Sequence, residues 1–136
     1  MLIERTITSI TELVPIAIDE VLKEFSIRTR IGEHDRLDLK LLLEEAITNA
    51  IKHGNQFDTS LPVKVSLEYN NDSVVVLRVK DQGKGFDQTN VPDLKTNNEE
   101  MASSGRGIFL MRKIADEVTY NAEGNEICIR KKIKIA

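Results

Sequence analysis

The sequence lacks the features that disulfide-bonded, secreted and membrane-spanning proteins need. It has one cysteine, Cys128, which leaves no partner for an internal disulfide. No stretch approaches the roughly 18 uninterrupted apolar residues of a membrane span. The first residues, Met1 to Arg5, lack the basic segment and the long apolar segment of a signal peptide. These absences predict a cytoplasmic protein that does not interact with a membrane.

The sequence also argues against binding of nucleic acid and against a metal site built from histidine and cysteine. The net charge of -3 at pH 7 gives no broad basic field for a phosphate backbone. The last basic run, residues 130–134, lies in an alternating strand pattern, which fits a solvated strand face better than a nucleic-acid patch. Cys128 stands among alternating apolar residues, and this predicts an inert thiol in the core.

What the sequence does contain fits one globular domain. Apolar residues make up 40% of the chain and charged residues 30%, which are ordinary values for such a domain. The 136 residues supply one core, because domains commonly run to about 100–150 residues. We therefore predict a single domain over residues 1–136, without internal repeats.

The first predicted elements are a strand and a helix. Residues 2–7 are rich in β-branched side chains, which favours a strand. The next residues have the pattern of a capping box, in which Ser9 opens a helix that reaches about Phe25. Proline is tolerated only in the first turn of a helix, so Pro15 places the start of the regular part near Val14.

The second helix has the strongest periodicity. Asp35 is its expected N-cap, and Gly54 with Asn55 is its expected end. Its predicted apolar face consists of Leu37, Leu39, Leu42, Leu43, Ala46, Ile47, Ala50 and Ile51. Glu45 and Asn49, four residues apart, share one flank of the helix, and Lys52 continues it. A polar stripe is therefore expected to border the buried face.

The rest of the chain predicts strands and a helix around one long loop. Strands are expected over residues 63–69, 73–80, 117–121 and 126–135, and a third helix over residues 107–115. Residues 81–104 are polar and lack apolar periodicity, which predicts a mobile loop, with a lid over a binding site around residues 87–104. The order of elements favours an α+β fold, a two-layer sandwich in which a mostly antiparallel mixed sheet carries its helices on one face.

Three segments, residues 45–54, 81–86 and 105–108, lie on the elements that a nucleotide site requires. Each segment alone also fits a solvated helix, a plain turn or a flexible hinge. Their order and spacing resemble the N-, G1- and G2-boxes of the Bergerat family, also called GHKL, which includes DNA gyrase and sensor histidine kinases. The resemblance implies a histidine-kinase-like ATPase fold that binds ATP with Mg²⁺. It also places Phe86, Ser104 and Ile108 in the cofactor-binding set.

The residues of the helix carry chemistry that agrees with this resemblance. Mg²⁺ prefers oxygen ligands and keeps several waters, so the side-chain carbonyl of Asn49 is a sufficient protein anchor for the metal. Lys52 can reach a phosphate, and Glu45 can accept a proton from an attacking hydroxyl beside the γ-phosphate. His53 is interpreted as a satisfied histidine that complements the dipole at the helix end, and not as a catalytic group.

The glycine-rich segments fit the two ends of a nucleotide. Asp81 directly follows a strand and can accept a hydrogen bond from the exocyclic amine of adenine, while Gly83 and Gly85 let the backbone pass close to the base and sugar. Gly105 and Gly107 open a helix whose backbone N–H groups can bind phosphate oxygens.

Arg106, between the second pair of glycines, adds positive charge at the phosphate end.

A free-standing domain of this length, with Glu-x-x-x-Asn in its helix and His53-Gly54 at its end, is similar to the bacterial anti-sigma-factor serine kinases. This resemblance spans nearly the whole chain. It implies a protein that phosphorylates a serine on an anti-anti-sigma partner of the STAS class, that also sequesters a sigma factor, and that is commonly a homodimer. Glu45 agrees, because a serine hydroxyl benefits from a carboxylate base.

Two other functions remain open on the sequence. A non-catalytic module would use ATP only to set a loop conformation that a partner protein reads. The catalytic domain of a two-component histidine kinase would transfer the phosphate to a histidine. Such kinases usually bring a dimerisation helix pair, for which this chain has no room.

Overall fold

A computed structural model describes residues 1–83 and 106–134 of the chain. Within these residues the strands are β1 (Leu2–Ile7), β2 (Val63–Tyr69), β3 (Val74–Lys80), β4 (Glu117–Tyr120) and β5 (Glu126–Lys132). The α-helices are α1 (Val14–Arg28), α2 (Glu33–Asn49) and α4 (Arg106–Ile114). A short 3-10 helix, η1 (Thr11–Leu13), precedes α1, and a π-helix, η2 (Ala50–Gly54), continues α2.

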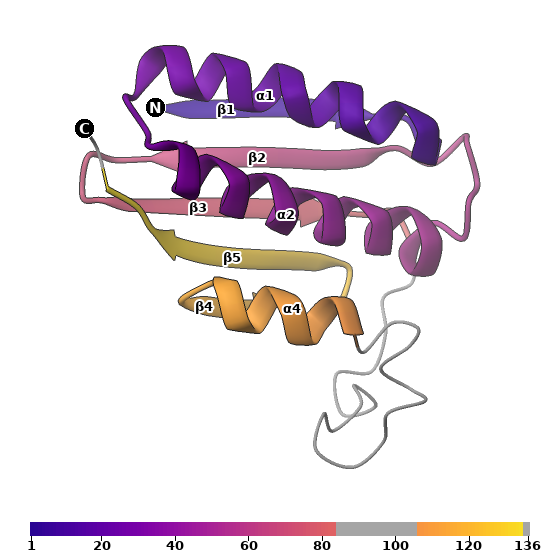
Figure 1. The fold of residues 1–136 in the computed structure, drawn as a ribbon. Coiled ribbons are helices and arrows are strands. Elements are labelled where there is room, and N and C mark those ends of the chain that lie inside the picture. The colour runs from indigo at the N-terminus through magenta and orange to yellow at the C-terminus, as the bar shows by residue number, and fades with distance from the viewer. Residues whose placement is uncertain (84–105, 135–136) are drawn as a thin grey trace.

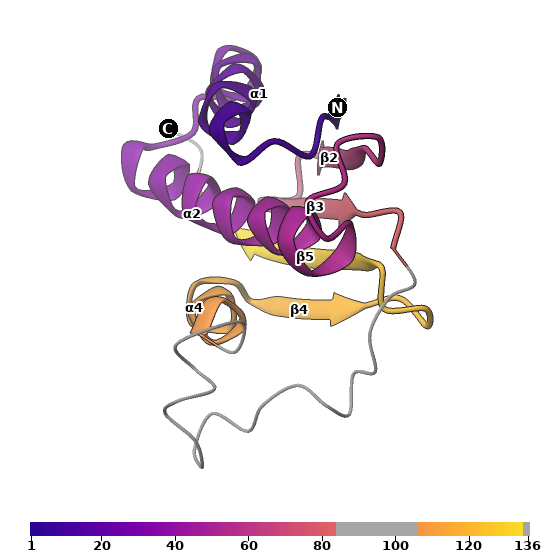
Figure 2. The same cartoon turned by 90° about the vertical axis from the view of Figure 1, so that its right-hand side faces the viewer.

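The strands form one sheet in the order β1-β2-β3-β5-β4, and every neighbouring pair is antiparallel. The three α-helices lie on one face of this sheet (Figures 1 and 2). The predicted two-layer α+β sandwich is therefore confirmed, and in the described residues the sheet is antiparallel throughout. None of the helices described is both long enough and apolar enough to cross a membrane.

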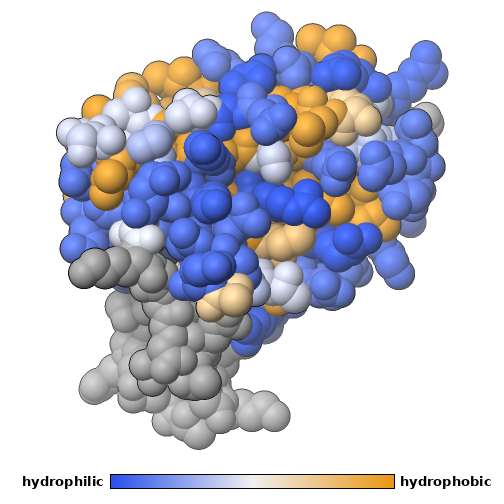
Figure 3. Space-filling model, turned by 180° about the vertical axis from the view of Figure 1, so that it is seen from behind, coloured by the Kyte–Doolittle hydropathy of each residue, from blue (hydrophilic) through white to orange (hydrophobic). Residues whose placement is uncertain are grey.

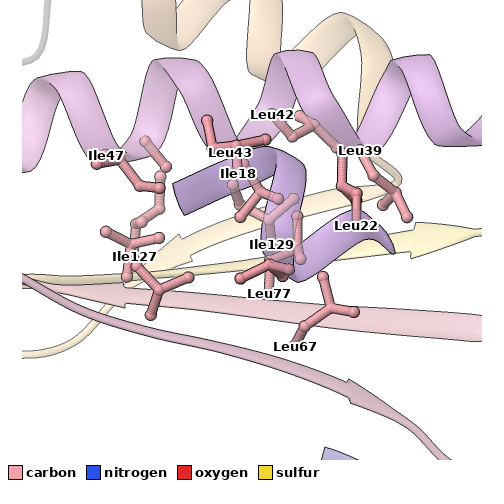
Figure 4. Close-up of a cluster of buried hydrophobic side chains, with 14 of the residues drawn as sticks. Ile18, Leu22, Leu39, Leu42, Leu43, Ile47, Leu67, Leu77, Ile127 and Ile129 are labelled. Atoms are coloured by element: carbon pink, nitrogen blue, oxygen red, sulfur yellow. The ribbon is translucent and has the colours of Figure 1, made fainter. Parts of the chain in front are cut away.

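The core lies between the sheet and the helices. The strand register places Leu67 opposite Leu77 and Leu77 opposite Ile129, which puts the three side chains in one row across the sheet. Figure 4 shows the helix residues that cover this region, namely Ile18, Leu22, Leu39, Leu42, Leu43 and Ile47. Burying one such side chain contributes roughly 1.5–3 kcal/mol. The apolar stripe of α2 therefore fixes which flank of that helix is left for polar residues.

The other face of the sheet is largely hydrophilic, as the view from behind shows (Figure 3). Side chains alternate between the two faces of a strand. In β5, Ile127 and Ile129 are buried in the core, so Cys128 between them lies on the outer face, opposite Arg78. Cys128 is only partly buried there, and the prediction of a core thiol is wrong.

The start of α1 differs in part from the sequence expectation. Ser9 does not cap the helix, because its Oγ donates to the backbone carbonyl of Leu61 at 2.5 Å. The residues predicted as a capping box run into η1 instead. The regular helix begins at Val14 with Pro15 in its first turn, which confirms that part of the prediction.

The start of α2 also differs. The helix begins at Glu33, and Asp35 accepts a hydrogen bond from the backbone N–H of Lys134 at 2.7 Å, so it does not act as the N-cap. Leu37, expected on the buried face, is 51% exposed. Both Ser9 and Asp35 bond to residues far along the chain, which a local pattern does not reveal.

Candidate functional site

The turn after β3 packs tightly against the end of η2. Asp81 is 8% exposed, its backbone N–H donates to the carbonyl of Asn125 at 2.9 Å, and its Oδ1 accepts from the N–H of Gly83 at 2.8 Å. A Cβ atom on Gly54 would overlap the Asp81 carboxyl group, and one on Gly83 would overlap the carbonyl of Gly54. Both positions therefore need glycine for the turn to reach this place.

The π-helix η2 brings Gly54 to that contact. The backbone N–H of Asn55 donates to the carbonyl of Ala50 at 2.8 Å, which spans five residues instead of the four of an α-helix. The wider turn changes the direction in which the end of the helix faces. The sequence predicted an ordinary helix end here. Single π-turns inside helices are frequent at functional sites.

At the other end of the site, α2 approaches α4 at Gly107. A Cβ atom on Gly107 would lie 2.5 Å from Oε2 of Glu45 and 3.4 Å from Nδ2 of Asn49. The two predicted polar residues of α2 therefore face the first turn of α4. The N–H groups of a first helical turn have no acceptor within their own helix, so this is a place where an anion can bind.

Burial shifts the pKa of the acidic groups at both ends of the site. It raises the pKa of Glu45 above its ordinary value, and the neighbouring charge of Glu44 raises this pKa further. A raised pKa makes a carboxylate a better proton acceptor. Burial also raises the pKa of Asp81, an effect that the hydrogen bond from Gly83 opposes.

The interpretation of His53 as a satisfied histidine at the helix end stays a prediction. Partial desolvation of its ring lowers its pKa, and the charge of Lys52 lowers this pKa further. Since the ordinary value is 6.5, the ring is mainly neutral at pH 7. Both residues are exposed on η2.

The structure gathers the described site residues around the C-terminal part of one helical segment, α2 with η2. Glu45 and Asn49 of α2 lie close to Gly107, and Gly54 at the end of η2 lies against Asp81 and Gly83. Ile108 is only 6% exposed in the core, so its backbone is what it can offer to a ligand. Gly85, Phe86, Ser104 and Gly105, the side chain of Arg106, and the lid around residues 87–104 lie outside the described residues.

The sequence interpretation missed Asn55. Its side chain is 2% exposed, and its Oδ1 accepts a hydrogen bond from the backbone N–H of Gln82 at 2.7 Å. It thereby holds the residue that follows Asp81. An asparagine after a glycine at a helix end is ordinary capping chemistry, so nothing local distinguishes it.

The polar groups of the site suit a purine nucleotide. The carboxylate of Asp81 has acceptor sites beyond the one that Gly83 uses, Asn49 offers an amide oxygen, and the start of α4 offers N–H groups. In the described part of the chain, no group of three or more His, Cys, Asp or Glu side chains could hold a metal ion. A metal at Asn49 would therefore need oxygen atoms of the ligand, which is how Mg²⁺ usually binds with phosphates.

Comparison with known proteins agrees with this geometry. Residues 11–131 match the family model of the histidine kinase-like ATPase domain. The chain belongs to this family. The description of this family supports the use of ATP.

Several curated relatives carry informative names. The chain is 32% identical over 101 residues to the anti-sigma F factor of Priestia megaterium, covering 69% of this chain and 67% of that protein. It is 36% identical over 92 residues to the anti-sigma F factor of Geobacillus thermodenitrificans, covering 65% and 62%. It is 30% identical over 105 residues to the serine-protein kinase RsbW of Staphylococcus aureus, covering 71% and 65%. The matched part is thus about two thirds of each relative.

A solved structure supports the fold. The histidine kinase domain of a blue-light activated histidine kinase from Erythrobacter litoralis matches with a TM-score of 0.51 and 22% identity, covering 72% of this chain and 44% of that chain. At this identity the match shows that the two share the histidine kinase-like ATPase fold.

Proposed function

We propose that this protein is an ATP-dependent serine-protein kinase of a bacterial partner-switching pathway. The observation that carries the proposal is the approach of Glu45 and Asn49 to the first turn of α4 at Gly107. This approach supports a carboxylate base and a metal-binding amide at the phosphate end of the proposed site, whose base end would be Asp81. The names of the relatives, anti-sigma F factor and serine-protein kinase, support the same function.

The transfer needs one base and one clamp for the phosphates. Asn49 would hold Mg²⁺ through its Oδ1 atom, and the metal when bound neutralises charge on the phosphate oxygens. Glu45 takes the proton of the serine hydroxyl as the serine oxygen bonds to the γ-phosphorus. The bond from that phosphorus to the bridging oxygen breaks, and ADP leaves. Lys52 and Arg106 contribute positive charge at the phosphates.

The partners follow from the same proposal. The phosphate acceptor is a serine of a STAS-domain anti-anti-sigma protein, and the kinase also sequesters a sigma factor, as a homodimer. The cytoplasm is the compartment in which ATP and sigma factors meet. Residues 1–136 act as one ATP-binding unit, and the lid around residues 87–104 stays a prediction.

The test uses the purified chain, Mg-ATP and a STAS-domain protein encoded beside its gene. Glu45→Ala should keep ATP affinity and lower the rate of transfer about 10²–10⁴-fold, the usual contribution of a general base. Asn49→Ala should lose the magnesium-dependent part of ATP binding. Thr48→Ala, an exposed neighbour on the same helix, is the matched control and should change neither property.

The outcomes separate the three candidate functions. Acid-stable phosphoserine on the STAS protein supports the kinase. Acid-labile phosphohistidine on another protein would identify a histidine kinase domain instead. Intact ATP after long incubation with every candidate partner, together with full signalling by the Glu45→Ala variant, would show a non-catalytic module.

A further inference from the structure

We propose that Asn55 is the positioning residue for the base end of the nucleotide site, and that it sets both ATP affinity and the preference for adenine over guanine. The inference rests on the proposed ATP site. It concerns a residue outside the three motifs of the sequence, which acts on the ligand through the turn at Asp81.

Asn55 connects three segments of the chain through one buried amide. Its Nδ2 donates to Ser9 Oγ at 2.9 Å, to the Leu61 carbonyl at 2.9 Å and to the Pro62 carbonyl at 3.1 Å. Its Oδ1 accepts from the N–H of Gln82 at 2.7 Å. The β1–α1 connection, the loop before β2 and the turn after β3 are therefore tied to the end of η2.

The orientation of this amide is determined by its partners. The carbonyls of Leu61 and Pro62 can only accept, and the N–H of Gln82 can only donate. A flipped amide would place its oxygen against two carbonyls and its NH₂ group against an N–H. Only one orientation of the amide matches the donors and acceptors around it, with the two hydrogens of Nδ2 shared among three acceptors, and this orientation directs Oδ1 to the N–H of Gln82.

In the described part of the turn after β3, residues 81–83, each backbone N–H donates to a partner. Asp81 donates to Asn125, Gln82 donates to Asn55, and Gly83 donates back to the carboxylate of Asp81. Without Asn55 the middle of these three contacts is lost. The Asp81 carboxylate then loses the support that fixes its direction toward the base.

The backbone after Asn55 indicates that its position is maintained against strain. Gln56 and Phe57 have φ values of 51° and 60°, in the left-handed region that side chains disfavour. Strained residues of this kind persist where surrounding contacts over-determine them, and they cluster at functional sites. Here the contacts that hold the segment are the buried bonds of Asn55 and the bond from Phe57 N–H to the Ile51 carbonyl at 2.9 Å.

Ser9 offers a matched control inside the same network. It is 2% exposed, as Asn55 is, and it accepts from Asn55 while donating to Leu61. It has no hydrogen bond to Gln82. Ser9→Ala therefore disturbs the buried network without removing the contact that positions the turn.

The experiment measures ATP and GTP affinity by calorimetry, and the steady-state constants of phosphorylation, on the full chain with Mg²⁺. Asn55→Ala should raise the Kd for ATP about tenfold, the size expected for one lost hydrogen bond in a buried network. Affinity for GTP should change little, since guanine has a carbonyl where adenine has its amine. The KM for ATP should rise while kcat stays within about threefold, because Glu45 and Asn49 are untouched.

Ser9→Ala should lower the melting temperature and leave the ATP-to-GTP ratio unchanged. Gln82→Ala should also leave the ratio unchanged, since the bond to Asn55 uses the backbone. If Asn55→Ala does not fold, the Asn55→Asp variant is measured instead, because aspartate keeps an oxygen atom near the N–H of Gln82. The second oxygen of this aspartate faces the carbonyls of Leu61 and Pro62. Asn55→Asp should therefore be less stable than the wild type and keep its ATP-to-GTP affinity ratio.

Loss of ATP affinity in equal measure for the Asn55 and Ser9 variants, or an unchanged ATP-to-GTP ratio in Asn55→Ala, would overturn the positioning role and leave the proposed kinase function standing. A folded Asn55→Asp protein that no longer prefers ATP to GTP would also overturn the positioning role. A wild-type chain that binds no ATP would overturn the proposed function and this inference together.

Discussion

The base end of the site depends on the absence of a side chain at Gly54. We expect Gly54→Ala to push the Asp81 carboxyl group aside, because the added Cβ would overlap it. The variant should bind ATP up to about tenfold more weakly, since one misplaced hydrogen bond is worth up to about 1.5 kcal/mol, and its melting temperature should fall. Calorimetry and thermal denaturation measure both effects.

Gly32→Ala is the control for this substitution. A Cβ atom at Gly32 would meet nothing within 4 Å, and its φ of -74° is one that alanine adopts. The control should bind ATP as the wild type does. Equal affinities for the wild type and Gly54→Ala would contradict the packing of Gly54 against Asp81.

The charge of Asp81 should make the stability of the protein depend on pH in a defined direction. Burial raises the pKa of Asp81 in the folded state above its ordinary value of 3.8. Its contribution to stability is then fully present below 3.8 and is lost as the pH rises through the folded-state value. Asp81→Asn carries no charge, so its stability relative to wild type should increase over that interval while its ATP affinity falls. Urea denaturation at a series of pH values measures the difference, and a decrease with rising pH would contradict it.

Among the elements, α2 with η2 is the one that both ends of the site share. Its apolar stripe packs on the sheet, and this leaves Glu45 and Asn49 on the flank that meets α4. Its π-turn then directs Gly54 toward the turn after β3. A change in the approach of α4 should therefore affect the phosphate end and leave the base end intact.

We expect Gly107→Ala to displace the Glu45 side chain, because the new Cβ would lie 2.5 Å from its Oε2. That oxygen is the far end of a flexible side chain, so the protein should still fold. Phosphoryl transfer should fall by about 10²-fold or more, the lower range for loss of a general base, while ATP affinity changes less. Single-turnover kinetics and calorimetry separate the two effects, and transfer at the wild-type rate would count against the role of Glu45.

For the whole molecule, stability depends on the apolar layer between helices and sheet. Leu39→Ala should lower the free energy of unfolding by about 2–5 kcal/mol, the range for a leucine removed from a packed core, since Leu39 is 0% exposed. Leu37→Ala, two residues earlier on the same helix, is the control. Leu37 is 51% exposed, so the change should stay within about 0.5 kcal/mol. Urea denaturation measures the free energy of unfolding of both variants. Equal losses of stability would contradict the position of Leu39 in the core.

The sequence by itself determined the layers of this protein and most of its motif residues. Apolar side chains at helical and strand periods can bury one face in only a few ways, so the α+β sandwich and the flank carrying Glu45 and Asn49 follow from local spacing. The strand run from Val63 to Tyr69 was predicted with its bounds for the same reason.

The tertiary structure alone decided the contacts between residues far apart in the chain. Ser9 and Asn55 are 46 residues apart, and Asn55 and Gln82 are 27 apart. Ser9 was expected as a helix cap, and Asn55 only as part of a helix end. A polar side chain takes whichever partner the folded backbone brings within reach, and burial makes that choice strongly favourable. Spacing along the sequence does not contain this information, because it depends on how the sheet and helices pack.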